Sequence, residues 1–323
     1  MSLLRVEELS VEFRTSRGAL RAVRDVTISL ERGETVCLVG ESGSGKSTLS
    51  MALVGLLPDN ARVEGRVAFD GRQLLSCSEE ELSDIRGRQV GVIVQDPARS
   101  LNPVLTIGRQ ISEVMVRHLA MGKRAAWVRA EELLAEVGVN DPALRVRQYP
   151  HELSGGIKQR VMIAMAIACE PAMLIADEPT TALDVTIQGQ VLRLLRRLCA
   201  ERQLALILVT HDFGVVAAMA DRVAVMYAGR VVELARVVEL FRNPQHPYTK
   251  ALLTANPRKV LDEDSASATL DPIPGAPPNP FDVGAGCSFS PRCGHRYEAC
   301  EARPSLVQCG EGHFSACWLA HHE

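Results

Sequence analysis

The stretch from Thr35 to Thr48, "TVCLVGESGSGKST", places an apolar run directly before a glycine-rich segment that ends in a lysine and two hydroxyl residues. Gly40-x4-Gly45-Lys46-Ser47 is the P-loop pattern, in which glycines let backbone N–H groups turn toward phosphate oxygens. The lysine brings positive charge to the β- and γ-phosphates, and the serine hydroxyl faces Mg²⁺. The alternative, a chance glycine-rich turn, does not account for the apolar run before the loop or for "KSTLSMALVGLL" after it. The predicted nucleotide-binding residues are Gly40, Ser42, Gly43, Gly45, Lys46, Ser47 and Thr48.

A second apolar run, in "MLIADEPTTALD" (173–184), ends in the adjacent acids Asp177 and Glu178. We expect Asp177 to hold Mg²⁺ through its water shell and Glu178 to polarise an attacking water. Two acids at a strand end are often only solvated charge, but a P-loop in the same chain makes that alternative weak. Both apolar runs predict buried parallel strands, so the chain is expected to have an α/β fold in which neighbouring strands bring the loop and the acids together.

The composition supports a large folded domain and excludes several classes of protein. With 323 residues, of which 46% are apolar, the chain can build one large domain and an appendage. Its net charge of −3 lacks the positive excess that is typical of proteins that bind nucleic acid, so we expect no nucleic-acid partner. The first residues do not form a signal peptide, and no apolar run is long enough to cross a bilayer. We therefore expect a cytosolic protein whose cysteines are not paired in disulfides.

"LSGGIKQR" (153–160) resembles the signature motif of the ATP-binding cassette (ABC) ATPases. Other parts of that family's pattern follow in its usual order. Gln95 in "VIVQDP" resembles the Q-loop, and Asp184 after Leu183 resembles the D-loop. His211 in "LILVTHDFG" resembles the switch histidine, and Phe13 stands where the family has an aromatic residue that stacks on adenine. Ile157 departs from the general signature, which has glutamine there, and is similar to the peptide-importer branch.

The resemblance implies an ABC-type ATPase domain at residues 1–255, with an antiparallel β part at its N-terminus and a helical subdomain at about 96–165. It implies that Glu178, His211 and Gln95 are catalytic and that Ser47, Gln95 and Asp177 hold Mg²⁺. In the family two cassettes pack head to tail, with ATP between the P-loop of one and the signature of the other. The residues that would contact the partner's ATP are Ser154, Gly155, Gly156, Gln159 and Asp184.

Three stretches resemble ATPases of oligopeptide, dipeptide and nickel importers: "QDPARSLNP" (95–103), "NPQHPYTKALL" (243–253) and "IPGAPPNP" within 257–280. This resemblance implies an ATPase subunit for peptide uptake at the cytoplasmic face of the cell membrane. Its partners would be a second, related ATPase chain, two membrane permease subunits and, indirectly, an extracytoplasmic substrate-binding protein. The alternatives are a nickel or other small-solute importer and a soluble, non-transport ABC ATPase with an iron–sulfur regulatory tail.

Five of the nine cysteines lie near the end of the chain, with the spacing Cys287-x5-Cys293-x6-Cys300-x8-Cys309-x7-Cys317. Structural zinc sites prefer close ligand pairs, two to four residues apart. Widely spaced thiolates suit an iron–sulfur cluster at least as well, although such cysteines can also be small core residues.

The tail resembles the "C-x-F-x-P-R-C…C…A-C" pattern of peptide-importer ATPases, which is associated with a [4Fe–4S] cluster. This resemblance implies Cys287, Cys293, Cys300 and Cys317 as ligands, with zinc as the alternative metal and Cys309 as a spare thiol. His295 and His313 are rival ligands. We expect residues 256–323 to form a linker and a cysteine-rich extension.

Overall fold

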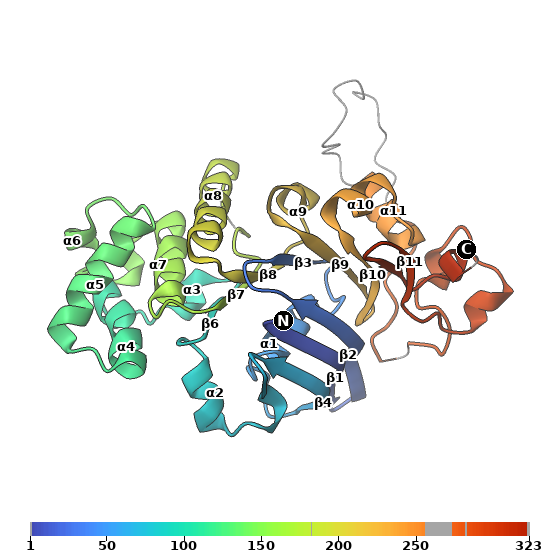
Figure 1. Ribbon diagram of the computed structural model, residues 1–323, viewed down its shortest axis with the longest axis horizontal. Coiled ribbons are helices and arrows are strands. Elements are labelled where there is room, and N and C mark those ends of the chain that lie inside the picture. Colours follow the sequence, from blue (N-terminus) through green and yellow to red (C-terminus); the bar gives the residue numbers. More distant parts are fainter. Residues whose placement is uncertain (1, 182, 256–272, 282, 322–323) are drawn as a thin grey trace. The chain divides into compact units, whose positions relative to one another are not determined.

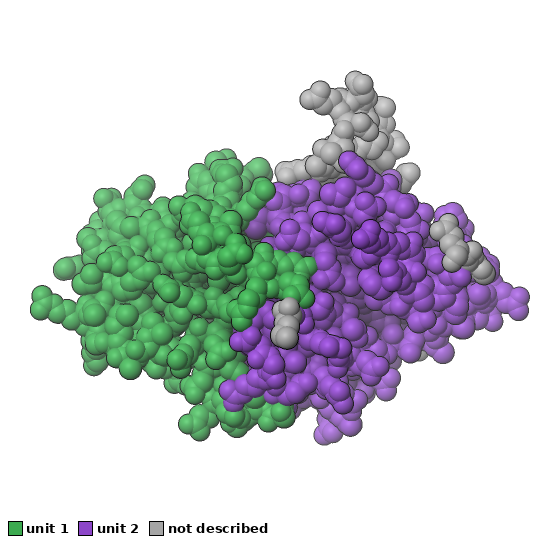
Figure 2. All heavy atoms as spheres, in the orientation of Figure 1, with its two compact units in different colours: residues 1, 31–34, 76–208 green, residues 2–30, 35–75, 209–323 purple. Residues whose placement is uncertain are grey.

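The computed structural model describes residues 2–181, 183–255, 273–281 and 283–321 (Figure 1). Two compact units make up the chain, and each draws on segments that are far apart in the sequence (Figure 2). Unit 1 contains residues 31–34 and 76–208, and unit 2 contains residues 2–30, 35–75 and the described part of 209–323. The predicted boundary after residue 255 stays a prediction, because residues 256–272, which hold most of the predicted linker, lie outside the described residues.

Unit 2 begins with an antiparallel sheet in the order β2-β1-β4-β5. Apolar residues of β1 alternate toward the core, as Leu4 and Val6 do, and the register then shifts between Val6 and Leu9, where Glu8 has φ 49°. The bulge inserts an extra residue into β1, so the buried positions change from Leu4 and Val6 to Leu9 and Val11. The strands are β1 (Leu4–Thr15), β2 (Gly18–Leu30), β4 (Ala61–Phe69) and β5 (Arg72–Gln73).

A second set of strands in unit 2 has the order β11-β12-β10-β9-β3. All of β3 is buried and runs parallel to β9, as its continuous apolar sequence predicts. The P-loop and α1 follow β3 directly. The bounds are β3 (Thr35–Val39), β9 (Arg222–Tyr227), β10 (Arg230–Arg236), β11 (Val307–Gly310), β12 (His313–Ser315), α1 (Lys46–Ala52), α9 (Phe213–Met219), α10 (Val237–Arg242) and α11 (Pro247–Ala255).

Unit 1 contains the strands β8-β7-β6, of which β6 and β7 are parallel, and a layer of helices. Helices α4, α5 and α7 pack on one another (Figure 1). They bury residues such as Ile111 and Leu133. The bounds are β6 (Val90–Ile93), β7 (Met173–Asp177), β8 (Ala205–Val209, whose last residue belongs to unit 2), α2 (Glu79–Ile85), α3 (Pro97–Ser100), α4 (Ile107–Leu119), α5 (Lys123–Glu136), α6 (Pro142–Arg145), α7 (Gly155–Ile167) and α8 (Val185–Arg202).

Short 3₁₀ helices are η1 (Leu74–Ser76), η2 (Pro150–Glu152), η3 (Ser290–Arg292), η4 (Glu298–Glu301) and η5 (Trp318–His321). The predicted fold class is confirmed: the fold is α/β, with an antiparallel N-terminal sheet and a helical subdomain. Within the part of the chain that the structure describes, no helix combines the length and the apolar character needed to cross a bilayer.

Candidate nucleotide site and cysteine-rich extension

The P-loop of unit 2 is organised around a buried lysine. Lys46 is 6% exposed, and its Nζ donates hydrogen bonds to the carbonyl oxygens of Gly40 (2.8 Å) and Glu41 (2.9 Å). Gly40 has φ 149° and Gly45 has φ 100°. A Cβ at Gly40 would overlap the carbonyl oxygen of Met226, so backbone conformation and close packing both require glycine there. The loop therefore concentrates positive charge and backbone donors at one point, as phosphate binding needs.

Two other predicted residues of unit 2 lie at the ends of strands. His211 is exposed in the turn after β8, where the Asp212 side chain caps α9 by accepting from the Gly214 N–H at 2.7 Å. Phe13 is half-exposed near the end of β1, opposite Leu20. Both side chains are therefore accessible enough to contact a ligand.

In unit 1 the acid pair follows β7. Asp177 is 5% exposed at the strand end, whereas Glu178 has φ 45° and is half-buried. One oxygen of Glu178, Oε2, accepts from Gln95 Nε2 and from Thr181 Oγ1, both at 2.9 Å. The structure thus brings Gln95 and Glu178 together, although 83 residues separate them. Thr181 was not predicted as a site residue. The two threonines that follow the acids in "DEPTT" could have indicated a hydroxyl partner for Glu178.

The signature residues of unit 1 open α7. Ser154 is the N-cap with extended backbone angles, and both Ser154 and Gly155 are exposed. A Cβ at Gly156 would lie 2.9 Å from Ile187 Cγ2, so glycine permits close packing on α8. Gln159, by contrast, is 1% exposed, and its Nε2 has no hydrogen-bond partner among the described residues. Asp184 caps α8 through a 2.9 Å bond from the Ile187 N–H, while remaining exposed.

The cysteine-rich extension gathers the four predicted thiols in unit 2. Burial raises the pKa of Cys317, a backbone hydrogen bond at Leu319 lowers it, and the charges of Cys287, Cys293 and Cys300 raise it further. The Cys287 N–H also donates to the Cys300 carbonyl at 3.0 Å. Cys309 is bound elsewhere, because its thiol donates to the His313 carbonyl at 3.5 Å. Even so, within the described residues no three or more His, Cys, Asp or Glu side chains are arranged to hold a metal ion.

His313 serves as an anchor in this structure. Its Nε2 lies 2.7 Å from Oε1 of Glu233, a fully buried carboxylate on β10. Glu233 also accepts from the N–H groups of Gln245 (2.7 Å) and His246 (3.0 Å). Although burial alone would raise the pKa of Glu233, these hydrogen bonds hold it below its ordinary value. The carboxylate therefore joins β10, β12 and the segment before α11, and His313 is already engaged as its partner.

Acid is expected to destabilise unit 2 through His246. Burial lowers the pKa of this imidazole to about 4, although the charge of Glu233 raises it. Since His246 of the unfolded chain takes up a proton near pH 6.5, its contribution to the free energy of unfolding is complete above that pH. It falls by up to about 1.4 kcal/mol per pH unit between 6.5 and 4. The lowered pKa of Glu233 acts in the same direction at still lower pH. Urea unfolding from pH 7 to 4.5 should give a shallower decline for His246→Asn than for the natural chain, and parallel declines would contradict this.

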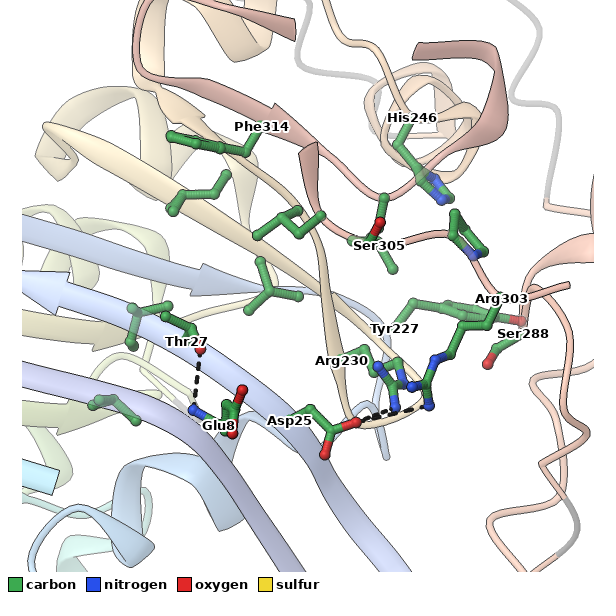
Figure 3. Close-up of a pocket in the computed structure, with 18 of the residues that line it drawn as sticks. Glu8, Asp25, Thr27, Tyr227, Arg230, His246, Ser288, Arg303, Ser305 and Phe314 are labelled. Carbon is green, nitrogen blue, oxygen red and sulfur yellow. Dashed lines mark hydrogen bonds and ion pairs between the residues drawn. The ribbon is translucent and has the colours of Figure 1, made fainter. Parts of the chain in front are cut away.

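A cavity of about 870 Å³ in unit 2 lies between β2, β10 and the extension (Figure 3). At its charged end Asp25 forms ion pairs with Arg230 (2.6 Å) and Arg303 (3.7 Å). Burial would raise the pKa of Asp25, but the hydrogen bond and charge of Arg230 lower it overall. Because Arg303 follows η4, this cluster connects the cysteine-rich segment to the antiparallel sheet.

Comparison with known proteins agrees with this geometry. Residues 23–181 match the family model for ABC transporters, and residues 232–300 match the oligopeptide/dipeptide transporter C-terminal region. The chain is 47% identical to the Bacillus subtilis dipeptide transport ATP-binding protein DppD, over 98% of this chain and 94% of that protein. It is 46% identical to the Salmonella typhimurium oligopeptide transport ATP-binding protein OppD, over 98% and 93%.

Among solved structures, the dimeric post-hydrolysis state of the ATP-binding cassette MJ0796 with ADP and Pi superposes with a TM-score of 0.65. That chain is 28% identical, and the match covers 72% of this chain and 98% of the cassette. The similarity thus includes both the ATPase core and, through the sequence relatives, the cysteine-rich extension. The chain belongs to the ABC ATPases of the oligopeptide and dipeptide transporter type.

Proposed function

We propose that this chain hydrolyses ATP and thereby powers the uptake of di- and oligopeptides through a membrane importer. The observation that carries the proposal is the end-to-end similarity to proteins named for dipeptide and oligopeptide transport, which includes the C-terminal region at residues 232–300. The local geometry agrees, because a buried P-loop lysine and an ordered carboxylate are the groups that hydrolysis of a phosphoanhydride requires.

In the proposed reaction Glu178 accepts a proton as water attacks the γ-phosphorus, and the bond to the β,γ-bridging oxygen breaks to give ADP and phosphate. Gln95 and Thr181 fix the carboxylate that takes the proton. Lys46 and the loop N–H groups bind the phosphates, His211 contacts the γ-phosphate, and Phe13 stacks on adenine. Mg²⁺ held by Ser47, Asp177 and Gln95 would neutralise phosphate charge.

The signature residues are proposed to act on the ATP of a second ATPase subunit. This is supported by the exposure of Ser154 and Gly155 at the N-terminus of α7, where main-chain N–H groups favour an anion. Gly156 and Asp184 complete the set. For Gln159 a direct contact stays a prediction, and its burial indicates that Ser154 and Gly155 carry more of the binding.

We infer that the chain works at the cytoplasmic face of the membrane, with a related ATPase chain and two permease subunits. A binding protein would deliver the peptide from the other side. To test this, the chain is co-expressed with candidate partner subunits, reconstituted into vesicles, and assayed for ATP-dependent uptake of a labelled dipeptide. Uptake of the dipeptide that stops with Lys46→Ala supports peptide import, whereas uptake of Ni²⁺ alone would redirect the assignment.

The cysteine-rich extension is proposed to hold a [4Fe–4S] cluster on Cys287, Cys293, Cys300 and Cys317. Support comes from the chemistry of the donor set, four soft thiols in one extension, and from the hydrogen bond of the Cys287 N–H to the Cys300 carbonyl, while Cys309 is bound elsewhere. When bound, such a cluster would connect the parts of the extension that carry Cys287, Cys293, Cys300 and Cys317. Zinc is the competing metal.

Cys293→Ala is therefore expected to remove iron and acid-labile sulfide from protein purified without oxygen, from about four of each per chain to near zero. Cys309→Ala is the matched control and should keep both. Zinc without sulfide in the natural chain, or unchanged iron in Cys293→Ala, would contradict the proposed ligands.

A further inference from the structure

We propose that Arg292 of the cysteine-rich extension keeps the P-loop able to bind nucleotide by neutralising the carboxylate of Glu41. Arg292 ends η3 and precedes Cys293, so it belongs to the extension by sequence. Glu41 is the first variable residue of the P-loop pattern. The inference rests on the proposed ATP site, since its effect is exerted on that loop.

The two side chains form a bidentate ion pair that spans 251 positions of sequence. Arg292 Nη1 donates to Glu41 Oε2 at 2.7 Å, and Nη2 donates to Oε1 at 3.0 Å. The Arg292 side chain is only 4% exposed, compared with 26% for Glu41. A planar guanidinium paired in this way fixes direction as well as distance, which a lysine would not do.

Arg292 is itself held by the surrounding extension and core. Its Nε donates to the Pro274 carbonyl at 2.8 Å, and Nη1 also lies 3.3 Å from the Tyr227 hydroxyl. The guanidinium carbon lies 5.9 Å from the centre of the Tyr227 ring and 6.0 Å from that of Phe289. The guanidinium therefore has a defined position whether or not Glu41 is present, which is what a support for another residue requires.

Three groups of Glu41, its N–H, its carbonyl and its carboxylate, each have a hydrogen-bond partner. Its N–H donates to the Tyr248 hydroxyl at 2.8 Å, and its carbonyl accepts from Lys46 Nζ at 2.9 Å. Its carboxylate is bound by Arg292. The carboxylate that Arg292 neutralises thus belongs to the residue whose carbonyl receives the lysine ammonium.

The ion pair also neutralises the negative charge that Glu41 brings to the P-loop. A carboxylate in the P-loop opposes the binding of phosphate, and Arg292 offsets that charge at contact distance. Without Arg292, a largely buried carboxylate would be left beside the loop, and it would both repel the nucleotide and compete for Lys46. Removal of Glu41 alone has no such effect, because Arg292 keeps its bonds to Pro274 and Tyr227.

This asymmetry gives a test on the full-length protein, purified without oxygen. Binding of a fluorescent ATP analogue, KM and kcat for ATP hydrolysis, and iron content are measured for Arg292→Leu, Glu41→Gln and the double variant. We expect Arg292→Leu to weaken ATP binding about tenfold, as for loss of a charge-assisted pair, and to raise KM more than it lowers kcat. Glu41→Gln should stay within about twofold, and Glu41→Gln in the Arg292→Leu background should restore most of the binding.

Arg303→Leu is the matched control, since it removes another ion-paired arginine of the extension, and it should leave ATP binding unchanged. Equally weak binding by Arg292→Leu and the double variant would overturn the proposal and make Arg292 a structural anchor only. If Arg292→Leu does not fold, Arg292→Gln replaces it, because it also removes the charge but can still form hydrogen bonds; a loss that Glu41→Gln again reverses is expected, and no loss would overturn the proposal. Failure of the ATPase assignment is distinguishable, because the natural chain itself would then bind no ATP.

Discussion

Glu178→Gln is expected to reduce ATP turnover by roughly 10²–10⁴-fold, the range associated with loss of a general base, while leaving ATP binding intact. The glutamine amide can still accept from Gln95 and Thr181 through its carbonyl oxygen, so the local structure around Glu178 is kept. What it lacks is a basic oxygen that can take the proton from the attacking water. Phosphate release at saturating ATP measures the loss, and binding of a fluorescent nucleotide measures what remains.

Thr181→Ala is the companion variant. It removes the hydrogen bond from Thr181 to the Glu178 carboxylate but leaves the carboxylate in place. A loss of about 10- to 100-fold is expected, because a hydrogen bond to a charged group contributes about 1.5–3 kcal/mol. Turnover by Glu178→Gln at the natural rate would remove Glu178 from the proposed reaction.

Gly40→Ala is expected to reduce the stability of the protein strongly. The residue has φ 149°, which side-chain-bearing residues rarely adopt, and an added Cβ would overlap the Met226 carbonyl oxygen and crowd Ser44. Steric overlap in a packed site and an unfavourable φ together should lower the free energy of unfolding by about 3–5 kcal/mol. Because Lys46 donates to the Gly40 carbonyl, nucleotide binding should fall with it.

Gly43→Ala distinguishes the effect of steric overlap from that of the unfavourable φ. Gly43 also has a positive φ, of 79°, but an added Cβ would meet no atom within 4 Å. Only the backbone cost of about 1 kcal/mol is expected there. Urea unfolding of both variants provides the measurement, and equal losses would show that crowding against Met226 is not the cause.

Local sequence patterns predicted the parts of the site that depend on local structure. The apolar run of β3 and the glycines at 40 and 45 indicated a strand followed by a phosphate loop, and that is how they fold. Ser154 likewise stands at the N-cap position of α7, at the helix start that the signature pattern implies. In each case neighbouring residues determine the conformation, so a short window carries the information.

Such local patterns could not predict contacts between residues that are far apart in the sequence. Neither the Gln95–Glu178 hydrogen bond nor the Arg292–Glu41 ion pair follows from spacing, because tertiary packing decides which distant side chains meet. The burial of Gln159 depends on how α7 packs in unit 1, which the motif does not encode. His313 resembled a metal ligand by proximity to cysteines, yet the buried acid that binds it is 80 residues away.

The pairing of β12 with β10 has a consequence for the solubility of the protein. Leu234 and Glu233 of β10 lie opposite Phe314 and Ser315, and β11 then pairs with β12. The extension therefore covers the edge of β10 with short strands, which offer an outside chain few open main-chain donors and acceptors. In a chain shortened before β11, the apolar edge of β10 would be left open to strands of other molecules. We therefore expect the cysteine-rich segment to protect the ATPase against edge-to-edge aggregation.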